Sequence, residues 1–151
     1  DVQYGHKVNL STEVGGFITY ASIEDGNTSD KALYQPVLEA HQKKYDCLPT
    51  RTVADGGYAS QENVKVGREM GVKGVAFNKP VGSTLTDMGL KQKTFKKLKD
   101  FRAGVEGNIS ELKRTFGCSK ARWKQLSGFK AFVWASILSY NLRRMMLQNS
   151  S

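Results

Sequence analysis

Two carboxylates stand where they could support metal-dependent chemistry, and Asp55 is the first. It follows a short apolar segment, residues 51–54, and precedes two glycines. In open α/β sheets ligands bind at the carboxyl ends of the strands, and glycines there let a substrate backbone or a metal come close. A turn aspartate that only bonds its own backbone would occupy the same position, so this alternative stays open.

Glu106 is the second carboxylate. It lies within residues 101–116, which we expect to form a helix. With Arg102 at zero and about 100° per residue, Glu106 falls at about +40° and Lys113 at about +20°, so the three share one face. Glu111 falls at about 180° and points the other way. An ordinary ion pair between residues four apart would also account for Arg102 and Glu106.

Two glycines beside Glu106 count against an ordinary surface helix. Gly104 and Gly107 each cost about 1 kcal/mol relative to alanine in a helix. Close approach by a sheet or by a DNA backbone would explain why they stand there.

A carboxylate at a strand end and another on a later helix could together hold Mg²⁺. Hard divalent cations take oxygen ligands, and Mg²⁺ is usually held by one or two carboxylates together with substrate phosphates. Two such ions stabilise both the attacking and the leaving oxygen of a phosphoryl transfer. Arg102 and Lys113 would then contact phosphates nearby.

A basic stretch further along could also contact nucleic acid. Lys120, Arg122 and Lys124 surround a tryptophan, which is the composition of a phosphate-binding segment with an aromatic ring for stacking. A surface loop whose tryptophan anchors the core explains these residues equally well. The histidines, His6 and His41, lack metal-ligand spacing, and we expect structural roles for them.

The positive charge is concentrated in one half of the 151-residue chain. Positions 1–75 carry 8 Lys and Arg against 10 Asp and Glu, a net of −2, whereas positions 76–151 carry 15 against 4, a net of +11. This asymmetry favours a polyanionic partner, most commonly nucleic acid, although a solvated basic surface that aids solubility stays open. Two widely separated cysteines exclude a disulfide scaffold. The sequence contains neither a P-loop nor a dinucleotide-binding fingerprint, so no motif supports nucleotide binding.

The opening residues have neither the basic start nor the apolar core of a secretion signal. The most apolar stretch, residues 129–147, is interrupted by Lys, Arg, Asn and Ser and is too polar to span a bilayer. We therefore expect a cytoplasmic protein. The start in strand-like sequence, without an initiator Met, suggests a fragment of a longer protein.

The hydrophobic pattern predicts an α/β protein that opens with a hairpin. Residues 4–12 and 17–23 alternate loosely and flank a Glu-Val-Gly-Gly turn. Turn chemistry follows, and Ser29 or Asp30 can then cap a helix.

A βαβ unit comes next. A short strand at 51–54, a helix from Ser60 to Met70 and a strand at 72–78 predict two parallel strands joined by a helix. A hairpin followed by alternating helices and strands predicts one mixed sheet with helices on its faces.

We expect residues 1–151 to form a single domain. Residues 79–100 predict an exposed basic loop or connector, and residues 101–147 predict the C-terminal helices. The last helix, from about residue 128 to 147, is expected to bury one apolar face. The side chains predicted for that face are Phe129, Phe132, Val133, Trp134, Ile137, Leu138, Leu142 and Met145.

Taken together, these segments resemble the C-terminal part of the catalytic domain of DDE transposases from bacterial insertion sequences. Arg102, Glu106 and Lys113 match the R-x3-E-x6-K part of the signature Y-x2-R-x3-E-x6-K, which defines one branch of that family. The chain departs from the signature at its first position, where Lys99 stands in place of Tyr. The strand end at 54–58 matches the D-x-G-Y of that family. Further segments that look like the family are residues 4–8, 26–30 and 139–144.

The resemblance implies an RNase H-like fold, a mixed sheet with flanking helices, here without its first strand. It implies DNA transposition, in which three carboxylates hold Mg²⁺ or Mn²⁺ and the enzyme cleaves a phosphodiester and transfers the strand. Asp55 matches the second Asp and Glu106 the Glu, while Arg102 and Lys113 match basic residues near the DNA end. The implied partners are transposon ends and target DNA, bound by a homodimer.

In such enzymes the first catalytic Asp lies on a strand before the segment that matches residues 4–8. We therefore expect a C-terminal fragment that is nearly inactive alone. One rival is a stand-alone nuclease of the same fold, completed by Asp30 or Glu24. Another is a non-catalytic DNA-binding or assembly module that relies on the basic region 91–130, and a third is a fragment without function.

Overall fold

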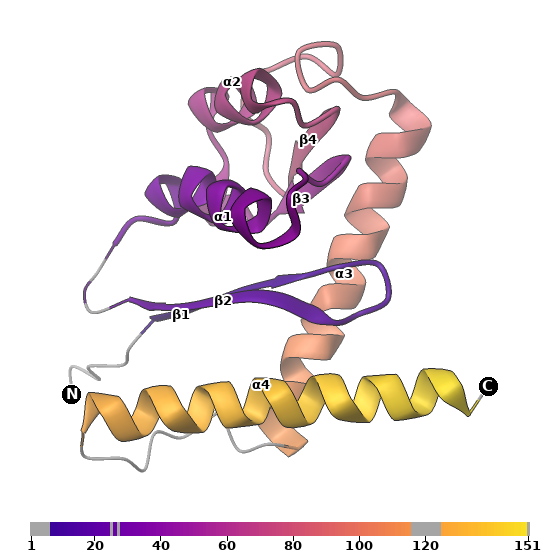
Figure 1. The fold of residues 1–151 in the computed structure, drawn as a ribbon. Helices are drawn as coiled ribbons and strands as arrows, with labels where there is room; N and C mark the ends of the chain where they lie inside the picture. Colours follow the sequence, from indigo (N-terminus) through magenta and orange to yellow (C-terminus); the bar gives the residue numbers. More distant parts are fainter. Residues whose placement is uncertain (1–6, 25, 27, 116–124, 151) are drawn as a thin grey trace. The chain divides into compact units, whose positions relative to one another are not determined.

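The structure, a computed structural model, describes residues 7–24, 26, 28–115 and 125–150 (Figure 1). Its elements are β1 (Lys7–Thr12), β2 (Ile18–Glu24), α1 (Asp30–Tyr45), β3 (Arg51–Ala54), the 3₁₀ turn η1 (Gly56–Tyr58), α2 (Gln61–Met70), β4 (Gly74–Phe77), α3 (Gln92–Thr115) and α4 (Leu126–Asn149).

The chain divides into two compact units, which we describe separately. The hairpin unit comprises residues 1–26 and 105–151, and the central unit comprises residues 27–104. The described strands pair as two two-stranded sheets, β1 with β2 and β3 with β4, where the sequence predicted one mixed sheet. The α/β class is confirmed.

The predicted hairpin is confirmed in the hairpin unit. Strands β1 and β2 are antiparallel, and the opposite charges of Lys7 and Glu24 face each other across the pair. The turn is held by the Glu13 carboxylate, which accepts hydrogen bonds from the backbone N–H groups of Gly15 at 2.8 Å and Phe17 at 3.1 Å.

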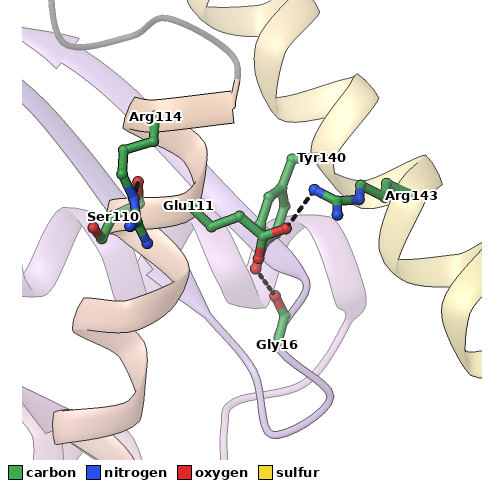
Figure 2. A network of polar contacts seen from close by, with 6 residues as sticks. All are labelled: Gly16, Ser110, Glu111, Arg114, Tyr140 and Arg143. Carbon is green, nitrogen blue, oxygen red and sulfur yellow. Dashed lines mark hydrogen bonds and ion pairs between the residues drawn. The ribbon is translucent and has the colours of Figure 1, made fainter.

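Helix α4 is fastened to the start of β2 by polar side chains. The Ile18 N–H donates to Asn141 Oδ1 at 2.9 Å, and Asn141 Nδ2 donates to the Ile18 carbonyl at 2.9 Å. The Tyr140 hydroxyl donates to the Gly16 carbonyl at 3.0 Å (Figure 2). The amide of Asn141 therefore satisfies the same two backbone groups that a neighbouring strand would satisfy.

The prediction of which side chains α4 buries is only partly right. Phe129, Val133 and Ile137 are buried, together with Tyr140, and Phe132 is half-buried. The prediction was wrong for four residues whose side chains are 48% to 61% exposed: Trp134, Leu138, Leu142 and Met145. Apolar residues stand on two sides of this helix, and the pattern alone does not say which side packs. Among the described helices, none is long and apolar enough to cross a membrane.

The predicted βαβ unit is confirmed in the central unit. Strands β3 and β4 are parallel, and α2 connects them. The Ser60 hydroxyl caps α2 by accepting a hydrogen bond from the Asn63 N–H at 3.0 Å. The helix ends at Gly71, whose φ of 111° lies in the left-handed region that only glycine adopts without strain.

A buried core surrounds β4, all four of whose residues are buried. The Tyr34 ring of α1 meets the Phe77 ring edge-on at 5.5 Å, and its hydroxyl lies 2.8 Å from Thr52 Oγ1 of β3. The buried members of this core are Tyr34, Leu38, Val64, Val72, Val75, Ala76, Phe77, Met88 and Leu90. This core carries the parallel strands and therefore fixes where their carboxyl ends lie.

Helix α3 begins earlier than the sequence predicted. It starts at Gln92, inside the stretch 79–100 that was expected to be a loop, and runs unbroken to Thr115. The physical reason is that Phe95 and Leu98, three residues apart on one face, pack against the core of the central unit.

Candidate active site

Asp55 lies at the carboxyl end of β3, as the sequence predicted, and it caps η1. Its Oδ1 accepts a hydrogen bond from the Gly56 N–H at 2.7 Å. The side chain is 58% exposed. The carboxylate therefore bonds its own turn and also faces solvent, so the backbone role and a ligand-binding role are compatible.

The two glycines after Asp55 are approached by protein side chains. A Cβ at Gly57 would collide with the Asp30 carboxylate, and a Cβ at Gly56 would lie 2.6 Å from the Lys79 side chain. A side chain at either position would therefore displace the Asp30 carboxylate or the Lys79 side chain. The turn lies between an acidic and a basic side chain, and Asp30, named above as a residue that could complete a nuclease site, lies against it.

Arg102 is directed at Asp55. Its Nη2 lies 3.8 Å from Asp55 Oδ1, and its side chain is only 13% exposed. On α3, Arg102 comes two turns after Phe95, which packs against the core, so the core-facing side of the helix presents the guanidinium to the strand end. At this distance and with Asp55 exposed, the ion pair adds little stability.

Asn63 is a residue that the sequence reasoning missed. It lies on α2, is 6% exposed, and its Nδ2 donates to the carbonyls of Lys31 at 3.0 Å and of Tyr58 at 2.8 Å. A signal was present, because Asn63 shares a helical face with Val64 and Gly67, which are both buried.

Glu106 and Lys113 belong to the hairpin unit, where both side chains are exposed on α3. Glu111 was expected to point away from them, and it accepts a 2.8 Å ion-paired hydrogen bond from Arg143 of α4 (Figure 2). Asp55 belongs to the central unit, so the two catalytic candidates, Asp55 and Glu106, lie in different units.

Of the two partners predicted for the glycines beside Glu106, a sheet or a DNA backbone, the structure addresses only the sheet. A Cβ at Gly104 or Gly107 would meet nothing within 4 Å. The close approach of a sheet is therefore absent among the residues that the structure describes. A DNA backbone remains the other partner that the two glycines were expected to admit.

Three predicted DNA-binding residues, Lys120, Arg122 and Lys124, lie outside the described residues.

His41 packs against Tyr45 with ring centroids 4.7 Å apart, and burial and the nearby Lys44 lower its pKa.

The donor chemistry of the two carboxylates fits a hard cation. Asp55 and Glu106 both present exposed carboxylate oxygens, the donors that Mg²⁺ and Mn²⁺ take. In the part of the chain that the structure describes, no three His, Cys, Asp or Glu side chains are grouped closely enough to hold a metal ion.

Comparison with known proteins identifies the family. The family model described as Transposase DDE domain matches residues 3–142. No curated protein and no solved structure matches the chain. Because the family match spans most of the chain and includes the strand end and helix described above, the chain belongs to the transposase DDE domain family.

Proposed function

We propose that this chain serves in DNA transposition and supplies Asp55 and Glu106, two of the three carboxylates of a metal-dependent cleavage of a phosphodiester and transfer of the strand. The fold in this proposal is RNase H-like, of the insertion-sequence type with the Y-R-E-K signature. Membership in a transposase family implies DNA as a partner. The observation that carries the proposal is the exposed Asp55 carboxylate at the end of β3, with the nearly buried Arg102 directed at it.

In this proposal Asp55 and Glu106 hold Mg²⁺ or Mn²⁺. The cation, when bound, supplies positive charge at the attacking and leaving oxygens. The Gly56 N–H fixes the rotamer of Asp55 by bonding Oδ1. Arg102 supplies a fixed positive charge beside Asp55, where a DNA phosphate would have to lie.

The test is DNA binding across a salt series with and without Mg²⁺, for the wild-type chain, Asp55→Asn and Glu106→Gln. We expect Mg²⁺ to tighten wild-type binding. Residues that only support a metal ligand change metal affinity by about 10- to 100-fold. Loss of a ligand should therefore raise the half-maximal Mg²⁺ concentration about 100-fold.

Glu69→Gln is the matched control, because it removes one exposed carboxylate from the end of α2. It should leave the Mg²⁺ dependence as in the wild type. If DNA binding ignores Mg²⁺ in all four proteins, the metal-dependent reaction is wrong and a plain DNA-binding module is the better reading.

One feature favours DNA binding independently of metal. Lys93, Lys96 and Lys97 are exposed on the first half of α3 and lie within about 100° of one another, while Phe95 and Leu98 point to the core. This helix face therefore presents three lysines together to a partner, and a phosphate backbone is the partner whose charge fits.

Replacing these three lysines with glutamine should weaken binding to DNA of any sequence. The slope of log K against log salt should fall by about 0.9 for each lysine that contacts a phosphate. The triple variant Lys43→Gln, Lys65→Gln and Lys73→Gln changes the net charge equally at positions outside α3 and should retain most of the slope. Equal losses in both triple variants would mean that only net charge matters.

A further inference from the structure

The strand-end turn that presents Asp55 is short, and the Gly56 N–H bonds the Asp55 carboxylate within it at 2.7 Å. Within it, the Tyr58 N–H donates to the Asp55 carbonyl at 3.0 Å, and the Ala59 N–H donates to the Gly56 carbonyl at 3.3 Å. Two of its five residues, 55–59, are glycines, which lose the most conformational freedom when they are fixed in one place. Contacts from outside the turn must therefore help to hold it in a single conformation.

Asn63 provides such contacts. One nitrogen, Nδ2, donates to the Tyr58 carbonyl at 2.8 Å and to the Lys31 carbonyl at 3.0 Å. Its own backbone N–H is fixed by the Ser60 cap at 3.0 Å. The amide thus connects α2 to the last residue of η1 and to the first turn of α1.

The first turn of α1 also carries the side chain that lies against the glycines. Asp30 begins this helix, and its carboxylate occupies the space where a Cβ of Gly57 would be. By bonding the Lys31 carbonyl, Asn63 fixes the backbone next to Asp30 as well as the end of η1. Both sides of the turn are therefore held by one buried side chain, which is 6% exposed.

We propose that Asn63 is a positioning residue for Asp55, holding the turn at residues 56–58 against the start of α1 so that the Asp55 carboxylate keeps one orientation. The proposal rests on the proposed function for the role of Asp55. Asn63 touches neither DNA nor metal in this scheme, and it acts only through the backbone of the turn.

The variant Asn63→Ala removes the two hydrogen bonds that Nδ2 donates. Val64→Ala is the matched control. Val64 is the next residue on α2, is 3% exposed, and its truncation loosens the same helix without affecting the two carbonyls. The reporter is the backbone amide resonance of Gly56 in the full chain, because this N–H donates to Asp55 Oδ1 at 2.7 Å. It reports the carboxylate position without needing metal, DNA or activity.

We expect the Gly56 amide resonance to shift or broaden in Asn63→Ala and to keep its position in Val64→Ala, while the amides of β4 stay in place in both. The half-maximal Mg²⁺ concentration for DNA binding should rise up to about tenfold in Asn63→Ala, with binding in EDTA unchanged. Asn63→Asp, which keeps the size but removes the two donated hydrogen bonds at neutral pH, should move Gly56 in the same way.

A Gly56 resonance that stays in place in Asn63→Ala, or that moves equally in Val64→Ala, would overturn the positioning role. The two proposals fail separately. If Asp55→Asn leaves the Mg²⁺ dependence unchanged, the proposed function fails, but the Gly56 resonance still decides whether Asn63 positions Asp55.

Discussion

Phe77→Ala is expected to lower the free energy of unfolding by about 3–5 kcal/mol. Phe77 is the last residue of β4, is 1% exposed, and meets the ring of Tyr34 edge-on at 5.5 Å. Truncation removes the ring from the centre of the core and leaves a cavity there. Because whole domains are stable by only about 5–15 kcal/mol, this single change should leave the central unit barely folded.

Urea unfolding followed by circular dichroism would measure the loss. Leu138→Ala is the control, since it truncates a large apolar side chain that is 61% exposed on α4, and its effect should stay within about 0.5 kcal/mol. A loss below about 1 kcal/mol for Phe77→Ala would mean that Phe77 is not part of a packed core.

The second large effect is a loss of stability in alkaline solution. Burial raises the pKa of Tyr34 to about 12 from its ordinary value of 10, and the hydrogen bond with Thr52 acts weakly in the opposite direction. Between pH 10 and pH 12 the unfolded chain has lost this proton and the folded chain keeps it. The stabilisation is therefore complete below pH 10 and falls by up to about 3 kcal/mol as the pH rises to 12.

Urea unfolding at several pH values from 9 to 12 would show this decline. Tyr34→Phe removes the titrating hydroxyl, so its unfolding free energy should change less with pH over this range than that of the wild type. Tyr45→Phe serves as the control, because Tyr45 is 41% exposed at the end of α1, and it should leave the decline in place. Equal slopes for Tyr34→Phe and the wild type would contradict the assignment.

Local signals in the sequence predicted the hairpin and the βαβ unit. Both depend on features of adjacent residues: a turn between two alternating segments, and a strand, glycines, the Ser60 cap and a second strand in succession. The start of α3 could not be found in this way. Only Phe95 and Leu98 mark the packed face of its first half, and the surrounding lysines resemble a loop.

The position of Asp55 could be predicted, whereas its neighbours could not. A strand end followed by glycines is visible in the sequence, and the structure has Asp55 there. The helical spacing grouped Arg102 with Glu106 and Lys113. In the structure, however, Phe95 packs against the core two helical turns before Arg102, and this orients Arg102 toward Asp55. The direction of the Arg102 side chain depends on how α3 packs against the core, and the spacing of polar residues in the sequence does not predict that packing.

The failure for α4 has a similar cause. The helix carries apolar side chains on two sides, and the side that holds Trp134 and Leu138 is exposed. The buried side is selected by partners far away in the sequence, among them Ile18 and Gly16, which bond Asn141 and Tyr140. Helical periodicity alone contains no information about these partners.

The bonds of Asn63 have a consequence for how this sequence can change over time. Its amide binds two main-chain oxygens, so positions 31 and 58 can carry other side chains and still offer the same acceptors. No other residue type can replace the amide, since glutamine is longer by a methylene group, aspartate lacks the donor hydrogens when ionised, and serine is too short. Among relatives, these bonds alone should therefore allow frequent substitution at position 31 and only rare substitution at position 63.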